Sequence, residues 1–185
     1  EVFVEKRKGK NEVFIGDFSG IKLNSGVTNV GQENVHIWSK FIRFNEKIKE
    51  HPFIKSIEFV THSQLKNALL RIRIFNIDSQ GIPTGDEVED DILIKIKKGT
   101  KNNILDLSKY NIKIQKEGIL IGFEYLKLEQ NAIIYNGKIS SYEPSIKGFF
   151  SGGETLLKLN RDGTLIDGSP NYGNVEIALK IKLTN

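Results

Sequence analysis

The chain has 185 residues, with 27 Lys and Arg against 23 Asp and Glu, a formal net charge of +4 and no cysteine. The absence of cysteine excludes disulfides, thiolate nucleophiles and zinc sites built on Cys. Basic and acidic residues are mixed along the chain, so the basic balance is a weak argument for nucleic-acid binding. No apolar run approaches the roughly 18 residues of a membrane helix. We expect no nucleic-acid partner and no transmembrane segment in this chain.

The sequence also contains no methionine. It therefore does not begin at an ordinary translation start, and we expect an upstream segment to have been removed. A signal peptide, a lipid-anchored leader and a preceding domain are each compatible with this expectation.

Strands are predicted along the whole chain, from short runs rich in apolar and β-branched residues. In chain order these runs are 13–18, 35–44, 54–60, 70–74, 92–96, 111–114, 119–128, 132–135, 155–159, 164–166 and 174–184. The polar segment 45–51 predicts one turn of helix at most, because Pro52 disfavours helical geometry at His51. Many short strands with little helix favour a two-sheet sandwich or a barrel, and we expect one domain over residues 1–185.

Basic residues alternate with apolar ones in several of these strands. Arg71 and Arg73 interleave with Leu70, Ile72 and Ile74, and Lys95 and Lys97 interleave with Ile92, Ile94 and Ile96. A period of two places the cations on one face of a sheet and the apolar side chains on the other. We interpret these cations as a solvated face that keeps sheet edges from pairing with other chains, and not as a phosphate site.

Turn residues punctuate the strands. In the segment "DSQGIP", Asp78 can bond nearby backbone amides, Gly81 can take a positive φ and Pro83 fixes its own backbone angle. The segment "NRDG", residues 160–163, has the chemistry of a tight hairpin between two strands. In "LDLSKY", Asp106 and Ser108 are suited to local bonds that shape a loop.

The middle of the chain resembles a β-sandwich module of Bacteroidota cell-envelope proteins that often follows a carboxypeptidase-regulatory-like domain. The resemblance rests on "LRIRIFNIDSQGIPTGD", "DILIKIKKGTKNNILDLSKYNIKI" and "EGILIGFEYL", which together cover about a third of the chain. It implies a jelly-roll-like antiparallel sandwich, export to the periplasm or the cell surface, and no catalytic residues. Trp38 is the single tryptophan, and this departs from the aromatic-rich later part of such modules.

Two carboxylates lie within predicted strands, Glu58 in "SIEFV" and Glu124 in "GFEYL". Sandwich folds can host enzymes that cleave sugars between two acids, and burial would raise the pKa of Glu124. The alternatives are that each acid pairs with a cation on the next strand or faces water.

The acidic run "GDEVEDD" contains weak calcium ligands, of which Asp86, Glu87 and Asp90 are the candidates. Its spacing is not that of an EF-hand loop, and a solvated charge run is the alternative. We predict no cofactor, with calcium as the one option kept open.

Motifs for other chemistry are absent from the sequence. His36, His51 and His62 are scattered without metal-ligand spacing, no GxSxG elbow occurs, and "GIKLNSG" lacks the residues of a phosphate loop.

Aromatic residues are the remaining candidates for a binding site. Phe149 and Phe150 lie in the Gly-rich stretch "KGFFSGGE", which we interpret as a loop, and adjacent side chains point to opposite sides of an extended chain. We therefore expect at most one of the two rings in the core and the other exposed. Tyr142, Tyr172 and Trp38 complete the set of ring candidates for stacking against a sugar or a protein partner.

These observations predict a noncatalytic, exported accessory or interaction module whose partner is a protein or glycan of the cell envelope. A carbohydrate-binding module is the first alternative, and it requires an exposed aromatic platform. A glycan-active enzyme is the second, and it requires Glu58 and Glu124 in one cleft, roughly 5 to 9.5 Å apart.

Overall fold

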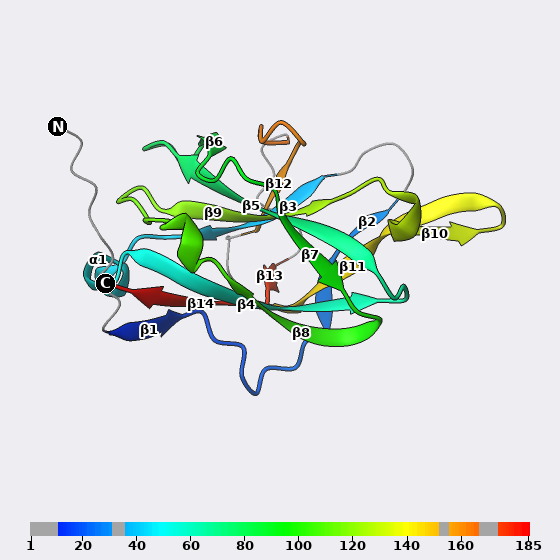
Figure 1. The fold of residues 1–185 in the computed structure, drawn as a ribbon, viewed down its shortest axis with the longest axis horizontal. Helices are drawn as coiled ribbons and strands as arrows, with labels where there is room; N and C mark the ends of the chain where they lie inside the picture. Colours follow the sequence, from blue (N-terminus) through cyan, green and yellow to red (C-terminus); the bar gives the residue numbers. More distant parts are fainter. Residues whose placement is uncertain (1–10, 31–35, 152–155, 167–173) are drawn as a thin grey trace.

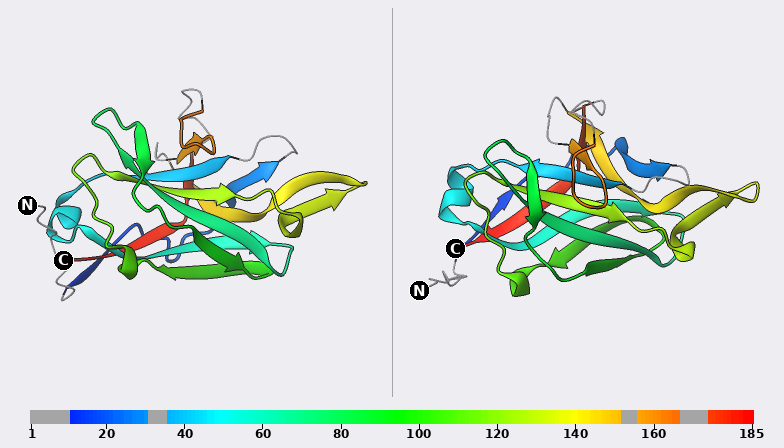
Figure 2. Two further views of the ribbon diagram at one scale, coloured as in Figure 1. Left: turned by 45° about the horizontal axis from the view of Figure 1, so that its top comes forward. Right: turned by 90° about the horizontal axis from the view of Figure 1, so that it is seen from above.

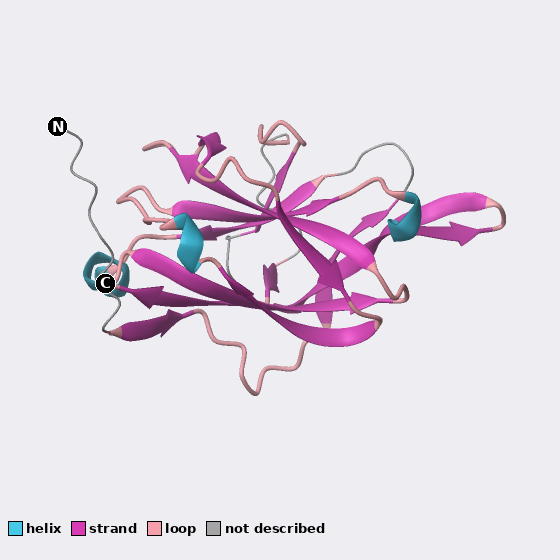
Figure 3. Ribbon diagram, in the orientation of Figure 1, coloured by secondary structure: helices cyan, strands magenta, loops and turns pink. Residues whose placement is uncertain are grey.

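The structure is a computed structural model, and it describes residues 11–30, 36–151, 156–166 and 174–185. Two antiparallel sheets face each other, and three short helices lie at the ends of strands (Figures 1 and 3). The predicted class, an all-β two-sheet antiparallel sandwich, is therefore confirmed. No helix among the described residues is long and apolar enough to cross a membrane.

The larger sheet, sheet A, is built around two long strands, β4 and β11. Its members are β1 (Glu12–Ile15), β2 (Ser25–Val30), β4 (Phe53–Ser63), β8 (Gly99–Asp106), β10 (Ala132–Tyr135), β11 (Lys138–Phe150), β13 (Val175–Ile177) and β14 (Leu179–Thr184). The β10–β11 hairpin projects beyond the rest of the sandwich in each view of Figures 1 and 2.

The second sheet, sheet B, is centred on β9 and β5. Its members are β3 (Ile37–Ile42), β5 (Ala68–Ile77), β6 (Pro83–Asp86), β7 (Ile92–Ile96), β9 (Ile119–Tyr125) and β12 (Leu156–Leu159). The helices are α1 (Glu46–Glu50), η1 (Ser108–Tyr110) and η2 (Glu129–Asn131). The chain passes repeatedly from one sheet to the other, so neighbours in each sheet are mostly distant in sequence, as in a jelly roll.

The main core lies between the sheets and comes from the alternating positions of their strands. Phe59 of β4 and Phe123 of β9 meet edge to face with ring centroids 5.1 Å apart. A second, smaller cluster lies on the outer face of sheet B, where Phe75 and Leu120 pack against Leu159. Because apolar side chains occupy both faces there, the outer face of sheet B is partly buried and not simply solvated.

The arginines of β5 correct one expectation. Arg71 and Arg73 do face outward, but β5 is an inner strand between β9 and the β6 and β7 strands, and both side chains are partly buried. They therefore protect no sheet edge. Lys95 and Lys97 are exposed, and Lys95 lies on β7, whose described partner is β5 alone, so the interpretation holds for that strand.

Local turn chemistry is confirmed where the sequence predicted it. Asp78 accepts backbone N–H bonds from Gln80 at 2.8 Å and from Ile82 at 2.9 Å, with Gly81 at φ 81° between them. The backbone N–H of Gly163 donates to the Asn160 carbonyl at 2.9 Å. The side chain of Asn45 caps α1 by accepting from the Ile48 amide at 3.1 Å.

Several strand boundaries were wrong. The sequence interpretation missed β2, β6, β8 and β11, and it treated the end of β11 as a loop. Residues 111–114 and 164–166 form only isolated bridges, between Phe53 and Lys113 and between Leu159 and Leu165. Strand β8 was missed because its first five residues, 99–103, include no large apolar residue, and β11 because Gly and Pro interrupt its apolar pattern.

Candidate functional site

Glu124 lies on the outer face of sheet B beneath a set of arginines. Its carboxylate is 1% exposed, and Arg71 Nη1 donates to Oε2 at 3.2 Å. Arg161 Nε donates to Oε1 at 3.4 Å, and Arg73 Nη1 lies 3.9 Å from Oε2. Each cation comes from a different position of β5 or from the turn after β12. Glu124 is therefore part of an ion-pair network with arginines from β5 and from the turn after β12.

The acidic run that begins at the end of β6 contributes carboxylates to the same ion-pair network. Arg73 bonds both oxygens of Asp86, and Arg71 Nη2 lies 3.1 Å from Asp91 Oδ1. Asn76 Nδ2 donates to Glu87 Oε2 at 2.5 Å. Of the calcium candidates, Asp86 and Glu87 thus have protein partners, while Asp90 is exposed. Among the described residues no group of three or more His, Asp or Glu side chains is arranged to hold a metal ion.

Glu58 is far from this network in the fold. It lies on β4 of sheet A, next to the inward-facing Phe59, so its side chain points to the outer face of sheet A. There it accepts a hydrogen bond from Asn102 Nδ2 at 2.6 Å. Glu124 faces outward from the opposite sheet, and the two carboxylates therefore share no cleft.

The histidines are also separate. His36 precedes β3, His51 follows α1, and His62 lies on β4 with its Nδ1 2.9 Å from Thr100 Oγ1. Burial, together with the positive charge of Lys158, lowers the pKa of His36.

The aromatic candidates divide into buried and exposed rings. Trp38 is 8% exposed, and its Nε1 donates to the Thr28 carbonyl at 3.3 Å, so its ring offers no platform. Tyr142 is likewise buried, and Tyr172 lies outside the described residues. Phe149 is half-buried and Phe150 is 62% exposed at the end of β11, which confirms that at most one of the pair enters the core.

The sequence missed a further exposed ring, Phe14 on the edge strand β1. Phe14 is 46% exposed, and the ammonium groups of Lys180 and Lys182 lie 4.8 and 5.2 Å from the centre of its ring. In "EVFIG" three apolar residues stand together, so periodicity does not say which of them faces outward. Pairing with β14 decides this, because Val13 and Ile15 pack on the core and leave Phe14 outside.

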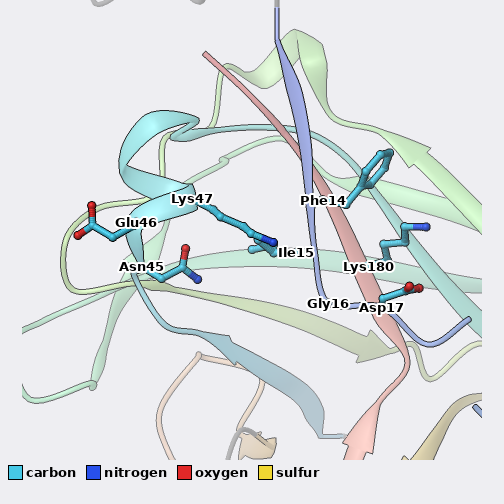
Figure 4. Close-up of a pocket in the computed structure, with 8 residues that line it drawn as sticks. All are labelled: Phe14, Ile15, Gly16, Asp17, Asn45, Glu46, Lys47 and Lys180. Carbon is cyan, nitrogen blue, oxygen red and sulfur yellow. The ribbon is translucent and has the colours of Figure 1, made fainter.

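An open hollow of about 740 Å³ surrounds the end of β1 and is shown in Figure 4. It is lined by Phe14, Ile15, Gly16, Asp17, Asn45, Glu46, Lys47 and Lys180. In Figure 4, Phe14, Asp17 and Lys180 lie on one side of β1, and Asn45 and Lys47 reach toward it from the other, while Glu46 points away. We call this surface the Phe14 groove.

The backbone at Gly16 shapes the middle of the groove. Gly16 has φ 67°, and a Cβ placed there would collide with the Leu179 carbonyl oxygen. Only glycine therefore lets the chain turn away so close to β14. Gly16 thus lines the hollow with its backbone, between Phe14 and α1.

Two smaller hollows adjoin the groove. One of about 210 Å³ shares Phe14 and Lys180 and extends over the face of sheet A to Ser56, Glu58 and Ile104. The other, of about 260 Å³, shares Ile15, Gly16 and Asn45 and reaches the buried pair of Lys40 and Glu176. Strand register places Lys182 opposite Ser56, and Lys180 opposite Glu58, so polar groups stand in rows beside the aromatic ring.

The pair of Lys40 and Glu176 joins the two sheets at the inner end of this surface. Lys40 Nζ donates to Glu176 Oε1 at 2.5 Å and to the Ile177 carbonyl at 3.1 Å, and Ser151 Oγ donates to Glu176 Oε2 at 2.9 Å. Burial raises the pKa of Glu176, but the bond and the charge of Lys40 outweigh it, so that the pKa is lowered. Glu176 is thus held ionised as part of the framework.

The surface around Phe14 brings together several kinds of side chain. It combines an exposed ring, ammonium groups, a carboxylate and amide and hydroxyl groups over an open area. Asp17 Oδ1 accepts a hydrogen bond from Ser19 Oγ at 2.7 Å, and Glu58 Oε1 accepts one from Asn102 Nδ2 at 2.6 Å.

Comparisons with known proteins add little to this picture. No family model matches the chain, and no curated protein matches it. A solved structure of the cysteine protease and lectin-like domains of Cwp84, a surface layer associated protein of Clostridium difficile, is similar at 10% identity and a TM-score of 0.49. The similarity covers 82% of this chain and 32% of that one. At this score and identity it supports no inference about function.

Proposed function

We propose that this chain is a noncatalytic interaction module that binds its partner in the Phe14 groove. The observation that carries the proposal is the exposed Phe14 ring, which is flanked by two ammonium groups and lies between adjoining hollows. An aromatic ring at a hollow that also carries a few polar side chains matches the composition of small-ligand sites, which are concave and partly apolar. The partner is a protein or a glycan of the cell envelope, and export to the periplasm or the cell surface is supported by the sequence resemblance alone.

A carbohydrate-binding module is the second candidate, and the arrangement on sheet A favours it. An aromatic ring presents an apolar face to the C–H groups of a sugar, while hydroxyl groups need hydrogen-bonding partners beside the ring. Lys180, Glu58 and Asn102 supply donors and acceptors on neighbouring strands of the same face. The enzyme alternative that used Glu58 and Glu124 has no such support, because these carboxylates face outward from different sheets.

A retention experiment tests the proposal. Wild-type protein and Phe14→Ala would be run through gels that contain soluble polysaccharides and screened on glycan and envelope-peptide arrays. Phe150→Ala is the matched control, since it removes an equally large exposed ring elsewhere. We expect Phe14→Ala to abolish binding and Phe150→Ala to leave it unchanged.

The opposite pattern would contradict the assignment of the groove. Binding that is lost in Phe150→Ala but kept in Phe14→Ala would move the site to the end of β11. Binding that neither substitution affects would show that neither the Phe14 groove nor the end of β11 is the site.

A further inference from the structure

The Phe14 groove contains two cations that have no ion-pair partner within the part of the chain that the structure describes. Lys47 and Lys180 both line the hollow, and among the described residues neither has a carboxylate oxygen within 4.0 Å. The neighbouring cations differ, because Lys182 lies 3.1 Å from Glu12 and Lys55 also bonds Glu12. Glu46 on α1 points away from the groove, and its Oε2 lies 3.3 Å from Lys49 Nζ.

The groove is also lined by two acids, Asp17 and Glu46, but among the described residues neither forms an ion pair with Lys47 or Lys180. Asp17 accepts bonds from the hydroxyl and the backbone N–H of its neighbour Ser19, at 2.7 and 3.0 Å, and Lys180 acts on it only through its charge. Glu58 bonds Asn102. A ligand in the groove therefore meets ammonium groups on both sides of the Gly16 backbone, together with the side chain of Asn45.

We propose that the ligand of the Phe14 groove is an acidic oligosaccharide that carries carboxylate groups, with one sugar ring on Phe14 and its carboxylates toward Lys180 and Lys47. This inference rests on the proposed function. Ammonium groups without a counter-ion among the described residues favour ligand carboxylates at these two points, and their position on different sides of β1 fits a chain of several sugars.

An acidic peptide is the competing ligand, and the strand geometry disfavours it. A peptide that adds to a sheet edge gains its affinity from main-chain hydrogen bonds. Among the described residues β1 pairs with β14 alone, and its other edge is only four residues long and ends at Gly16 with φ 67°. A stacked sugar ring needs no such edge.

Titration calorimetry with paired ligands tests the inference. The probes are an oligogalacturonate, the same chain with its carboxylates methyl-esterified, and a glutamate oligopeptide, each at low and high salt. The proteins are the wild type, Lys180→Gln, Lys47→Gln and Phe14→Ala, with Lys95→Gln as a matched control for loss of a surface charge.

We expect the acidic sugar to bind, with affinity that falls about fivefold in Lys180→Gln, about two- to threefold in Lys47→Gln and at least about tenfold in Phe14→Ala. Lys95→Gln should change nothing, and the esterified chain should bind several times more weakly.

Three outcomes would overturn the inference. Equal, Phe14-dependent binding of acidic and esterified chains would leave the groove as the binding site but remove the charge preference. Phe14-dependent binding of the peptide alone would replace the ligand class. Acidic-sugar binding that salt abolishes but Phe14→Ala leaves intact would be nonspecific attraction, and the proposed groove would fail with it.

Discussion

A carboxylate that is almost fully buried on the outer side of a sheet must find its counter-charges on neighbouring strands, since an unpaired buried charge is costly. Glu124 does so through Arg71, Arg73 and Arg161, and Asp86 and Asp91 share two of the same cations. Removing one member of a buried ion pair lowers the stability of the fold by more than the intact pair contributes, because the charges left behind lose a partner.

Glu124→Gln should therefore lower the free energy of unfolding by about 3 kcal/mol. Urea denaturation at neutral pH measures this change. Glu58→Gln is the control, because Glu58 is partly exposed and bonds only one neutral amide, and its effect should stay within about 0.5 kcal/mol. Equal effects of the two substitutions would show that the arginine network does not depend on Glu124.

Glu143 is a buried acid of a different kind. Burial raises its pKa despite a hydrogen bond from Ser63 and the charge of His62, and its Oε2 has no hydrogen-bond partner among the residues that the structure describes. A carboxyl whose pKa is higher in the folded state binds more protons when folded. Its contribution to stability is present at low pH and is lost as the pH rises through the folded pKa.

Glu143→Gln should consequently become more stable relative to the wild type as the pH rises from 4 to 8. The difference in melting temperature between the two proteins, followed across this range, measures the effect. A difference that shrinks with rising pH would show that the carboxylate, and not the neutral acid, is the better tolerated form.

At the level of elements, the pair of Lys40 and Glu176 connects strands of opposite sheets, β3 and β13. Lys40 faces inward beside Trp38 and Ile42, where an ammonium group needs the carboxylate and the Ile177 carbonyl to offset its burial. Because the pKa of Glu176 is lowered in the fold, its contribution exists above its unfolded pKa and is lost as the pH falls through the folded value.

Lys40→Met should destabilise the protein by about 2 to 3 kcal/mol at pH 7.5 and by less at pH 4, where Glu176 can be neutral. Chemical denaturation at both pH values measures this. Adding Glu176→Leu to the same protein should recover part of the loss, because no unpaired charge then remains. If the double variant is as unstable as the sum of the single ones, the two side chains are not coupled.

Across the whole molecule, both sheets contribute to one continuous core, which extends from Val27 to Leu183. Neither sheet could bury its inner face without the other, so we expect a single cooperative transition over residues 1–185. Trp38 in sheet B reports on one layer by fluorescence, and far-UV circular dichroism reports on all strands. The two denaturation curves should coincide, and separate midpoints would indicate two independent units.

Part of this fold could be predicted from the alternation of apolar and polar side chains along single strands. The inward and outward positions of β5, β7 and β14 follow from a period of two, and turns such as Asp78–Pro83 follow from local backbone preferences. Strands without such a pattern were missed. In β11, Pro144 and Gly148 interrupt the apolar positions, and its many partners are distant in sequence.

The sequence by itself therefore determined the all-β class, the faces of its regular strands and the chemistry of its turns, since these depend on neighbours within a few residues. Only the tertiary structure decided which strands pair, and with them the position of the proposed binding surface. Pairing of β1 with β14 placed Phe14 beside Lys180 and Lys182, and pairing of β5 with β9 placed Glu124 beneath arginines. Both outcomes depend on contacts between residues more than 40 positions apart, for which a single sequence carries no local signal.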